Sequence, residues 1–259
     1  RQDEVPGLTK RALQELKNNG YKIGMCTSRF PTEFSRFPKS MLNQFDAVIA
    51  GTGGLVMQQD QIMHMELLDQ DTAIQFIKYM DAHGITYQWI TDTLEEHFNQ
   101  EPPIKVRTRV FNWRGRLPSI QKWNGERLLN LMFYDADESE KEELCHLSQN
   151  VSVQCWHTSG QINAKGVDKA FGIREFAKLF HLKAEEIAAF GDGQNDVPMI
   201  SETGFGIAVG DANQVLKEHA DMVTDPIEEG GIYHACVKQG WIQEEEGIKI
   251  IFFDIDGTT

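Results

Sequence analysis

The sequence predicts an α/β fold built around a parallel sheet. Two short runs, residues 187–190 and 248–253, are almost wholly apolar, which is typical of strands buried on both faces of a parallel sheet. Each run leads into acidic residues, and open α/β sheets bind ligands just beyond the carboxyl ends of their strands. A chain of 259 residues, 41% of them hydrophobic, is long enough for one large α/β domain and an inserted domain.

The first predicted elements are a helix over residues 8–19, ended by Gly20, and a strand over residues 21–26. The strand leads into Thr27 and Ser28. A hydroxyl and its neighbouring backbone N–H groups can hold a phosphate oxygen at a strand end, although an ordinary turn has the same composition. One face of the helix carries its apolar residues, Leu8, Ala12, Leu13 and Leu16.

The middle of the chain alternates short strands and helices, which predicts a small α+β sheet with helices on one face. The predicted strands cover residues 62–67, 86–90, 128–134 and 151–156, and the predicted helices cover residues 71–83 and 137–149.

Residues 166–169 begin a further predicted helix, with Lys169 in its first turn. The charge of Lys169 lies beside a helix N-terminus, where the helix dipole favours an anion over a cation. We therefore expect an anion to bind close to Lys169. The predicted buried stripe of this helix is Val167, Ala170, Phe171, Ile173, Ala177 and Phe180.

Acidic residues follow both predicted parallel strands. Asp254 and Asp256 stand at positions i and i+2, so their side chains leave the strand end on the same side and can face one ligand. Asp192 follows the other strand, with Asn195 and Asp196 close behind. Carboxylates this close repel each other unless a cation or a shared proton intervenes, and oxygen ligands of this kind suit Mg²⁺. The alternatives are a solvated strand end at the first pair and a helix cap at Asp196.

Together these residues resemble the four motifs of the haloacid dehalogenase superfamily of phosphatases, and most closely those of its Cof-type branch. Motifs I to IV are matched in turn by residues 254–258, 26–29, 166–169 and 191–196. Lys169, rather than Lys165, matches the lysine of motif III, because it lies in the run that enters the helix. The resemblance implies a Rossmann-like doubly wound parallel sheet core, formed by residues 1–56 and 158–259, and an inserted α+β cap domain at residues 57–157.

The resemblance also implies a magnesium-dependent phosphatase of small phosphorylated metabolites, sugar phosphates first, that works through an aspartyl-phosphate. Asp254 would be the nucleophile and Asp256 the general acid and then base, while Thr27 or Ser28 would bind the phosphoryl oxygens together with Lys169. The alternatives are a phosphomutase on the same core and a catalytically silent phosphate-binding module. The implied magnesium ligands are Asp254, the backbone carbonyl of Asp256, Asp192, and Asn195 or Asp196.

Residues 105–116 carry five positive charges and two aromatic side chains. One interpretation is a solvated loop or an edge strand guarded by its charges. The other is a cap surface that steers phosphorylated substrates, read by Arg107 and Arg109. One such stretch in an acidic chain is thin support for RNA binding.

The order of the motifs departs from the family, in which motif I lies near the N-terminus. Either the protein is circularly permuted, or the sequence joins segments out of their natural order, and we favour the second because a natural cut behind the nucleophile strand would free the phosphate loop. We expect Thr259 to lie close to Arg1. A further departure is the run 51–54, Gly-Thr-Gly-Gly, where relatives usually have an Asn before the Gly.

Composition limits the partners and the compartment. A net charge of −14 argues against nucleic acid or an acidic membrane surface as the main partner. We recognise neither a signal peptide nor an apolar run long enough to span a bilayer. The oligomeric state is left open. No metal-ligand or disulfide spacing is evident among the cysteines, which predicts a reducing cytoplasm; they are Cys26, Cys145, Cys155 and Cys236.

Overall fold

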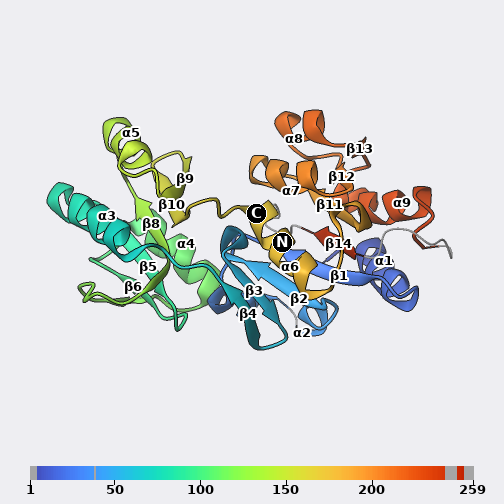
Figure 1. Cartoon of the computed structure of the whole chain (residues 1–259), viewed down its shortest axis with the longest axis horizontal. Coiled ribbons are helices and arrows are strands. Elements are labelled where there is room, and N and C mark those ends of the chain that lie inside the picture. Colours follow the sequence, from blue (N-terminus) through green and yellow to red (C-terminus); the bar gives the residue numbers. More distant parts are fainter. Residues whose placement is uncertain (1–4, 38, 243–249, 254–259) are drawn as a thin grey trace. The chain divides into compact units, whose positions relative to one another are not determined.

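The computed structural model describes residues 5–37, 39–242 and 250–253 (Figure 1). The chain divides into two compact units. Unit 1 comprises Arg1–Arg29, Phe37–His64 and Asp168–Thr259, and unit 2 comprises Phe30–Arg36 and Met65–Val167.

Unit 1 is built on a sheet that has eight strands within the described residues, in the order β13-β12-β11-β14-β1-β2-β3-β4. The strands from β13 to β2 pair in parallel, and β3 pairs antiparallel with β2. The parallel core of the sheet confirms the predicted α/β class. The strands are β1 (Lys22–Cys26), β2 (Ala47–Ala50), β3 (Leu55–Gln58), β4 (Gln61–Met65), β11 (Ile187–Gly191), β12 (Phe205–Ala208), β13 (Met222–Val223) and β14 (Ile250–Phe253).

Helices of unit 1 pack against this sheet. α6 packs against β1, β2 and β3, α7 packs against β11 and β12, and α1 packs against β1 and α9. In α1, Gly20 follows the helix with a φ of +85°, and the expected apolar face is buried at Ala12, Leu13 and Leu16. The helices are α1 (Gly7–Asn18), α2 (Lys39–Leu42), α6 (Lys169–Leu179), α7 (Val197–Glu202), α8 (Gln214–His219) and α9 (Gly231–Lys238).

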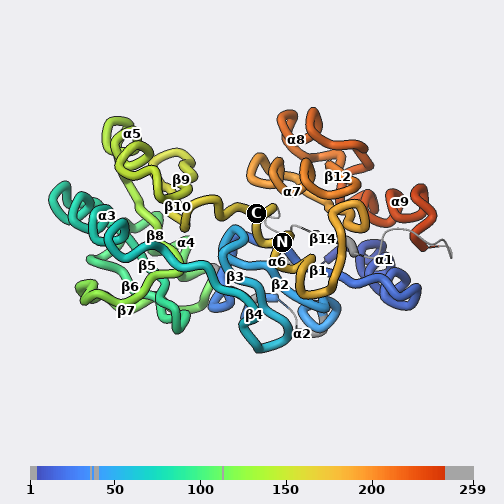
Figure 2. Tube along the Cα trace, in the orientation of Figure 1, coloured from blue at the N-terminus to red at the C-terminus, as the bar shows by residue number. Residues whose placement is uncertain are grey.

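β14 comes last in the chain and lies in the middle of the sheet, between β1 and β11 (Figure 1). On one side of it follow β1 and β2, which Figure 2 traces in shades of blue. Its last residue, Phe253, is in register with Met25 of β1 and Phe190 of β11. The predicted strand over residues 248–253 is therefore a central parallel strand, described from Ile250 onward.

Unit 2 contains a sheet of six described strands in the order β7-β6-β5-β8-β10-β9, antiparallel except between β6 and β7. The strands are β5 (Thr86–Thr91), β6 (Glu96–Phe98), β7 (Ser119–Ile120), β8 (Leu128–Tyr134), β9 (Val151–Trp156) and β10 (Ser159–Ala164). The helices are α3 (Gln70–His83), α4 (Ile104–Arg114) and α5 (Glu138–His146).

The helices of unit 2 cover both faces of its sheet. Leu131 and Phe133 of β8 pack in the cluster that contains Phe76 of α3 and Leu144 of α5. Their neighbours Met132 and Tyr134 pack with Val106 and Val110 of α4. Because successive strand residues point to opposite faces, α4 lies on the face opposite α3 and α5. The prediction of helices on one face is therefore wrong.

α4 also rules out one of the two interpretations of residues 105–116, a solvated loop or an edge strand. Val106 and Val110, four residues apart, are buried on one side of the helix. Pro103 precedes the helix, where its missing N–H costs nothing, and Gly115 ends it with a φ of +68°. The sequence did not indicate this helix, because two valines among five charged residues give only a weak helical periodicity.

A buried charge cluster attaches the segment Phe30–Arg36 to unit 2. The guanidinium of Arg114 pairs with the carboxylates of Glu33, at 3.3 Å, and Glu96, and Glu96 also accepts a hydrogen bond from Thr32. Burial raises the pKa of Glu96, against the opposing effect of Arg114.

The boundaries of the two units differ from the predicted domain boundaries at 56/57 and 157/158. β4, expected in the inserted domain, is the edge strand of the sheet in unit 1, and β10, expected in the core, lies between β8 and β9 in unit 2. Sheet membership depends on which partner a strand meets, and an apolar alternation does not specify the partner.

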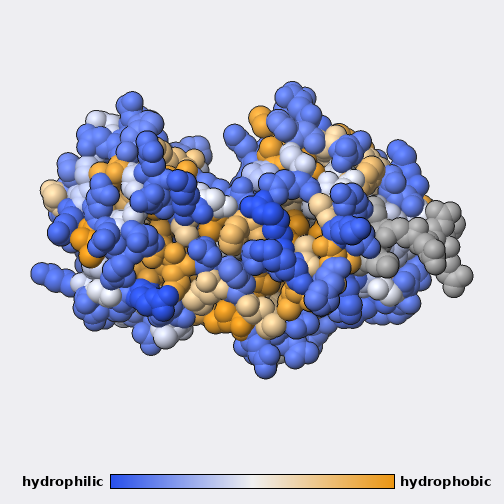
Figure 3. Space-filling view, in the orientation of Figure 1, coloured by the Kyte–Doolittle hydropathy of each residue, from blue (hydrophilic) through white to orange (hydrophobic). Residues whose placement is uncertain are grey.

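Hydrophilic residues cover much of the visible surface (Figure 3). Within the described ranges, no helix combines the length and the apolar character needed to cross a bilayer.

Candidate active site

Motif II begins where β1 ends. Thr27 is fully buried, and its N–H donates to the carbonyl of Ile49 in β2 at 2.9 Å. Its hydroxyl oxygen accepts a hydrogen bond of 3.1 Å from the backbone N–H of Arg29. The Thr27 side chain is therefore held within the turn that follows β1.

Motif IV begins where β11 ends, and Asp196 organises it. One carboxylate oxygen of Asp196 accepts hydrogen bonds from the backbone N–H groups of Asp192, at 3.0 Å, and Gly193, at 2.9 Å. Asp196 is fully buried and makes no side-chain cap bond to α7. The interpretation as a helix cap is wrong: the carboxylate fastens the loop before it, which carries Asp192.

Motif III joins motif IV through a buried ion pair. Lys169, the first residue of α6, is fully buried, and its ammonium nitrogen lies 2.6 Å from the second carboxylate oxygen of Asp196. Asp168 caps the helix by accepting a 2.8 Å hydrogen bond from the N–H of Phe171. The anion expected beside Lys169 thus includes a carboxylate of the protein itself. Lys165, by contrast, is exposed and belongs to unit 2.

Motif II meets motif IV through Ser28, whose hydroxyl oxygen accepts a 3.2 Å hydrogen bond from the side-chain amide of Asn195. Residues of three motifs that are far apart in the chain therefore lie together at the carboxyl ends of the parallel strands in unit 1.

Motif I itself falls outside the described residues. Asp254 and Asp256 are among the residues that are not described, as are Arg1 and Thr259. The strand that leads to Asp254 is described, and β1 and β11 on either side of it lead to Thr27 and Asp192.

Residues 51–54 pack closely against the first turn of α6, which carries Lys169. This role was not predicted from the sequence. Gly53 has a φ of +103°, and a Cβ there would lie 1.9 Å from the carbonyl oxygen of Asp168. Gly172 in α6 meets Gly53 in return, with 2.8 Å between a Cβ built there and the Gly53 Cα. Thr52 is buried with a φ of 57°, a conformation that is costly for a β-branched residue. The glycines in this run and in α6 were the available signal for this close packing.

Comparison with known proteins decides the family. The family model for haloacid dehalogenase-like hydrolases matches residues 1–236. The chain belongs to this family. The resemblance to Cof-type haloacid dehalogenase phosphatases is thereby confirmed.

Relatives match this hydrolase over nearly its whole length. The putative phosphatase YkrA of Bacillus subtilis is 26% identical over 246 residues, which cover 92% of each chain. The 5-amino-6-(5-phospho-D-ribitylamino)uracil phosphatase YwtE of the same organism is 21% identical, with 86% of this chain and 87% of the relative covered. The family and the names of these relatives confirm the predicted enzyme class, a phosphoric monoester hydrolase.

Solved structures share the fold. BT4131, a sugar phosphatase of subclass IIB, aligns with a TM-score of 0.78 at 24% identity over 91% of this chain and 92% of its own. TM0651 of Thermotoga maritima aligns with a TM-score of 0.77 at 22% identity over 91% of each chain. The predicted Rossmann-like core with an inserted α+β domain is consistent with these neighbours.

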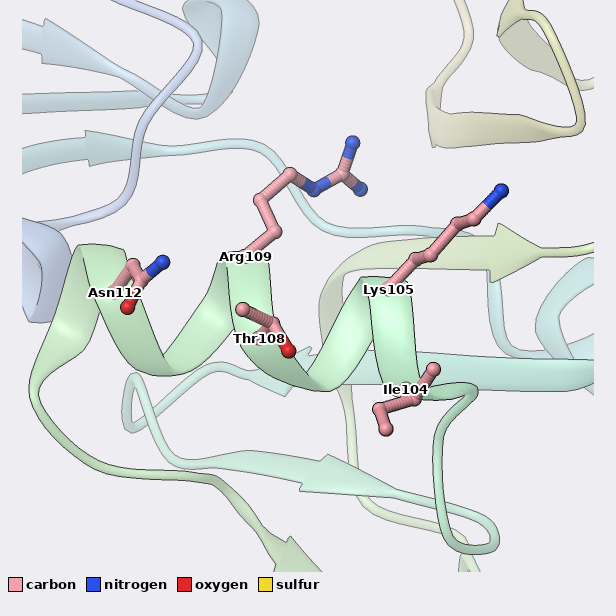
Figure 4. Close-up of a pocket in the computed structure, with 5 residues that line it drawn as sticks. All are labelled: Ile104, Lys105, Thr108, Arg109 and Asn112. Carbon is pink, nitrogen blue, oxygen red and sulfur yellow. The ribbon is translucent and has the colours of Figure 1, made fainter.

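The two predicted substrate-reading arginines of the hydrolase differ in their surroundings. Arg107 is exposed and pairs with Glu101 at 2.6 Å. Arg109 lies 5.9 Å above the ring of Tyr134 and lines a surface hollow of about 480 Å³ along α4. Figure 4 shows Lys105 and Arg109 extending from the same side of the helix. This α4 hollow is lined by Ile104, Lys105, Thr108, Arg109 and Asn112.

Proposed function

We propose that this hydrolase is a magnesium-dependent phosphatase of small phosphorylated metabolites, with sugar phosphates as the first candidates, and that it works through an aspartyl-phosphate on Asp254. The observation that carries this proposal is the central place of β14, whose next residue is Asp254, between the strands that lead to Thr27 and Asp192. The names of the full-length relatives, both phosphatases, support the same class of reaction.

In this mechanism Asp254 attacks phosphorus, and the leaving oxygen takes a proton from Asp256. Asp256 then removes a proton from the water that hydrolyses the aspartyl-phosphate, so its role reverses between the two steps. Thr27 and Lys169 would bind the transferred oxygens. The buried pair with Asp196 supports this role, because it holds the Lys169 charge in place before substrate arrives.

The residues that follow β11 and β14 in the sequence carry the donors that Mg²⁺ prefers, carboxylate and carbonyl oxygens. Asp192, half-buried after β11, and Asp254 would be carboxylate ligands, together with the backbone carbonyl of Asp256. Asp196 already uses both oxygens within the protein, so we assign it the orienting role and Asn195 the place of an additional ligand. When bound, Mg²⁺ offsets the repulsion between the nucleophile and a dianionic phosphate.

We expect the purified protein to release inorganic phosphate from phosphate esters when Mg²⁺ is present. The measurement is phosphate release from a panel of sugar phosphates, nucleotides and flavin mononucleotide. Chelation with EDTA should abolish release, and added Mg²⁺ should restore it. Conversion of a sugar phosphate into an isomer without phosphate release would identify a phosphomutase instead, and tight ligand binding without turnover would identify a binding module.

We further propose that the α4 hollow binds the leaving group of the substrate, the part of the phosphate ester that is released when the phosphoryl group is transferred. In the part of the chain that is described, the ion pairs of α4 are made by Arg107 and Arg114 and none by Lys105 or Arg109, although the protein carries a net charge of −14. Two unpaired cations one helical turn apart repel each other, and an anionic group of a ligand would relieve that repulsion. Of the two predicted arginines, Arg109 is therefore the stronger candidate, since Arg107 already has Glu101.

Replacing Arg109 with Gln should lower kcat/KM for the preferred natural ester about tenfold, equivalent to about 1.4 kcal/mol. It should barely affect a small aryl phosphate, whose leaving group makes few contacts outside the phosphate site. Arg107→Gln is the matched control and should be milder on both substrates. Equal losses on both substrates in the Arg109 variant would point to a structural role.

A cytoplasmic location and the absence of nucleic-acid and membrane partners stay predictions.

A further inference from the structure

Two cysteines of unit 2 lie together at its surface. The sulfur atoms of Cys145, in α5, and Cys155, in β9, are 3.1 Å apart, and both residues are exposed. Both are free thiols, and the spacing of the cysteines in the sequence did not indicate that these two lie together. A spacing of ten residues gave no signal because Cys145 lies in a helix and Cys155 in the following strand, and only the packing of the helix against the strand brings the side chains together.

Regular structure holds both cysteines in place. Leu144, next to Cys145, is fully buried, and a capping box formed by Asp137 and Glu140 begins α5. Cys155 is in register with Gly160 of β10. The two sulfur atoms need to approach by only about 1 Å to reach the bond length of a disulfide, about 2.05 Å.

We propose that Cys145 and Cys155 are a redox modification site that closes reversibly into an intramolecular disulfide. The oxidant is a low-molecular-weight disulfide. The Cys145 thiolate attacks one of its sulfurs, the oxidant's S–S bond breaks, and the first thiolate leaves and takes up a proton. The Cys155 thiolate then attacks the Cys145 sulfur and expels the second thiolate. Two protein thiols are oxidised and one disulfide is reduced to two thiols.

The surroundings set the order of these steps. Although Cys155 is exposed as a whole residue, partial desolvation of its thiol, followed by the hydrogen bond with Cys145, raises the pKa of Cys155 to about 12, while the nearby charge of Lys141 opposes the shift. The raised pKa makes Cys155 the poorer attacking thiol, so we assign the first attack to Cys145. Because the second step needs the Cys155 thiolate, closure should become faster as the pH rises.

The test is incubation of the full-length protein with glutathione disulfide, followed by alkylation of the remaining thiols and peptide mapping by mass spectrometry. The intact chain should lose the mass of two hydrogen atoms, a peptide pair linked through Cys145 and Cys155 should appear, and dithiothreitol should reverse both changes. The linked pair should exceed disulfides between chains at micromolar protein, because the partner thiol's effective concentration is at least on the order of millimolar.

Matched variants and internal controls complete the test. Cys145→Ser and Cys155→Ser should each abolish the linked pair and leave the other thiol either alkylated or carrying glutathione. The buried thiols of Cys26 and Cys236 in the same wild-type protein should stay reduced. Stable glutathione on Cys145 while Cys155 remains open to alkylation, or disulfides only between chains, would overturn the proposal.

Discussion

Asp254→Asn should reduce phosphatase turnover by a factor on the order of 10⁴ or more, the scale seen when a nucleophile is removed from an active site. The amide keeps the size of the side chain but can neither attack phosphorus as a carboxylate nor contribute a negative charge to a metal site. The measurement is Mg²⁺-dependent phosphate release by the purified variant, with thermal unfolding as the check that it is folded. Turnover that survives in a folded variant would end the covalent mechanism.

Two neighbouring substitutions separate the proposed roles. Asp256→Asn should abolish turnover yet leave Mg²⁺ affinity nearly unchanged, because the proposed metal contact of Asp256 is its backbone carbonyl. Asp192→Asn should weaken Mg²⁺ binding, because it removes a carboxylate ligand. Isothermal titration with Mg²⁺ measures both. Equal losses of Mg²⁺ affinity in the two variants would contradict this division.

Lys169→Ala should lower kcat/KM by orders of magnitude and also destabilise the protein. The substitution removes a positive charge from the proposed phosphoryl site and leaves the Asp196 carboxylate fully buried without its ion-pair partner at 2.6 Å. Breaking a buried pair by removing one partner typically costs about 3–5 kcal/mol. The measurements are steady-state kinetics below the unfolding transition and the free energy of unfolding in urea.

Lys165→Ala is the matched control for Lys169→Ala. Lys165 is exposed, and an exposed lysine contributes little to stability, so this variant should be close to wild type in both measurements. The reverse ranking, with Lys165 more important than Lys169, would mean that the lysine of motif III has been misassigned.

Local pattern was enough to predict the elements that carry the candidate site. An apolar run with acids behind it identified β11 and β14 as parallel strands, since such runs are buried on both faces whatever their neighbours are. The bounds predicted for β8 and β9 agree with the structure residue for residue. The motifs around Thr27, Lys169 and Asp192 could also be recognised from the sequence, because the residues of each motif are contiguous in the chain.

Contacts between distant segments were decided only by the tertiary structure. Whether Asp196 caps a helix or fastens a loop depends on Lys169, 27 residues away, and on the N–H groups of Asp192 and Gly193. Membership of β4 and β10 in one sheet or the other, and the meeting of Cys145 with Cys155, likewise depend on the partners that each segment finds. Periodicity reports which face of an element is buried but not what buries it, and these roles follow from the partner.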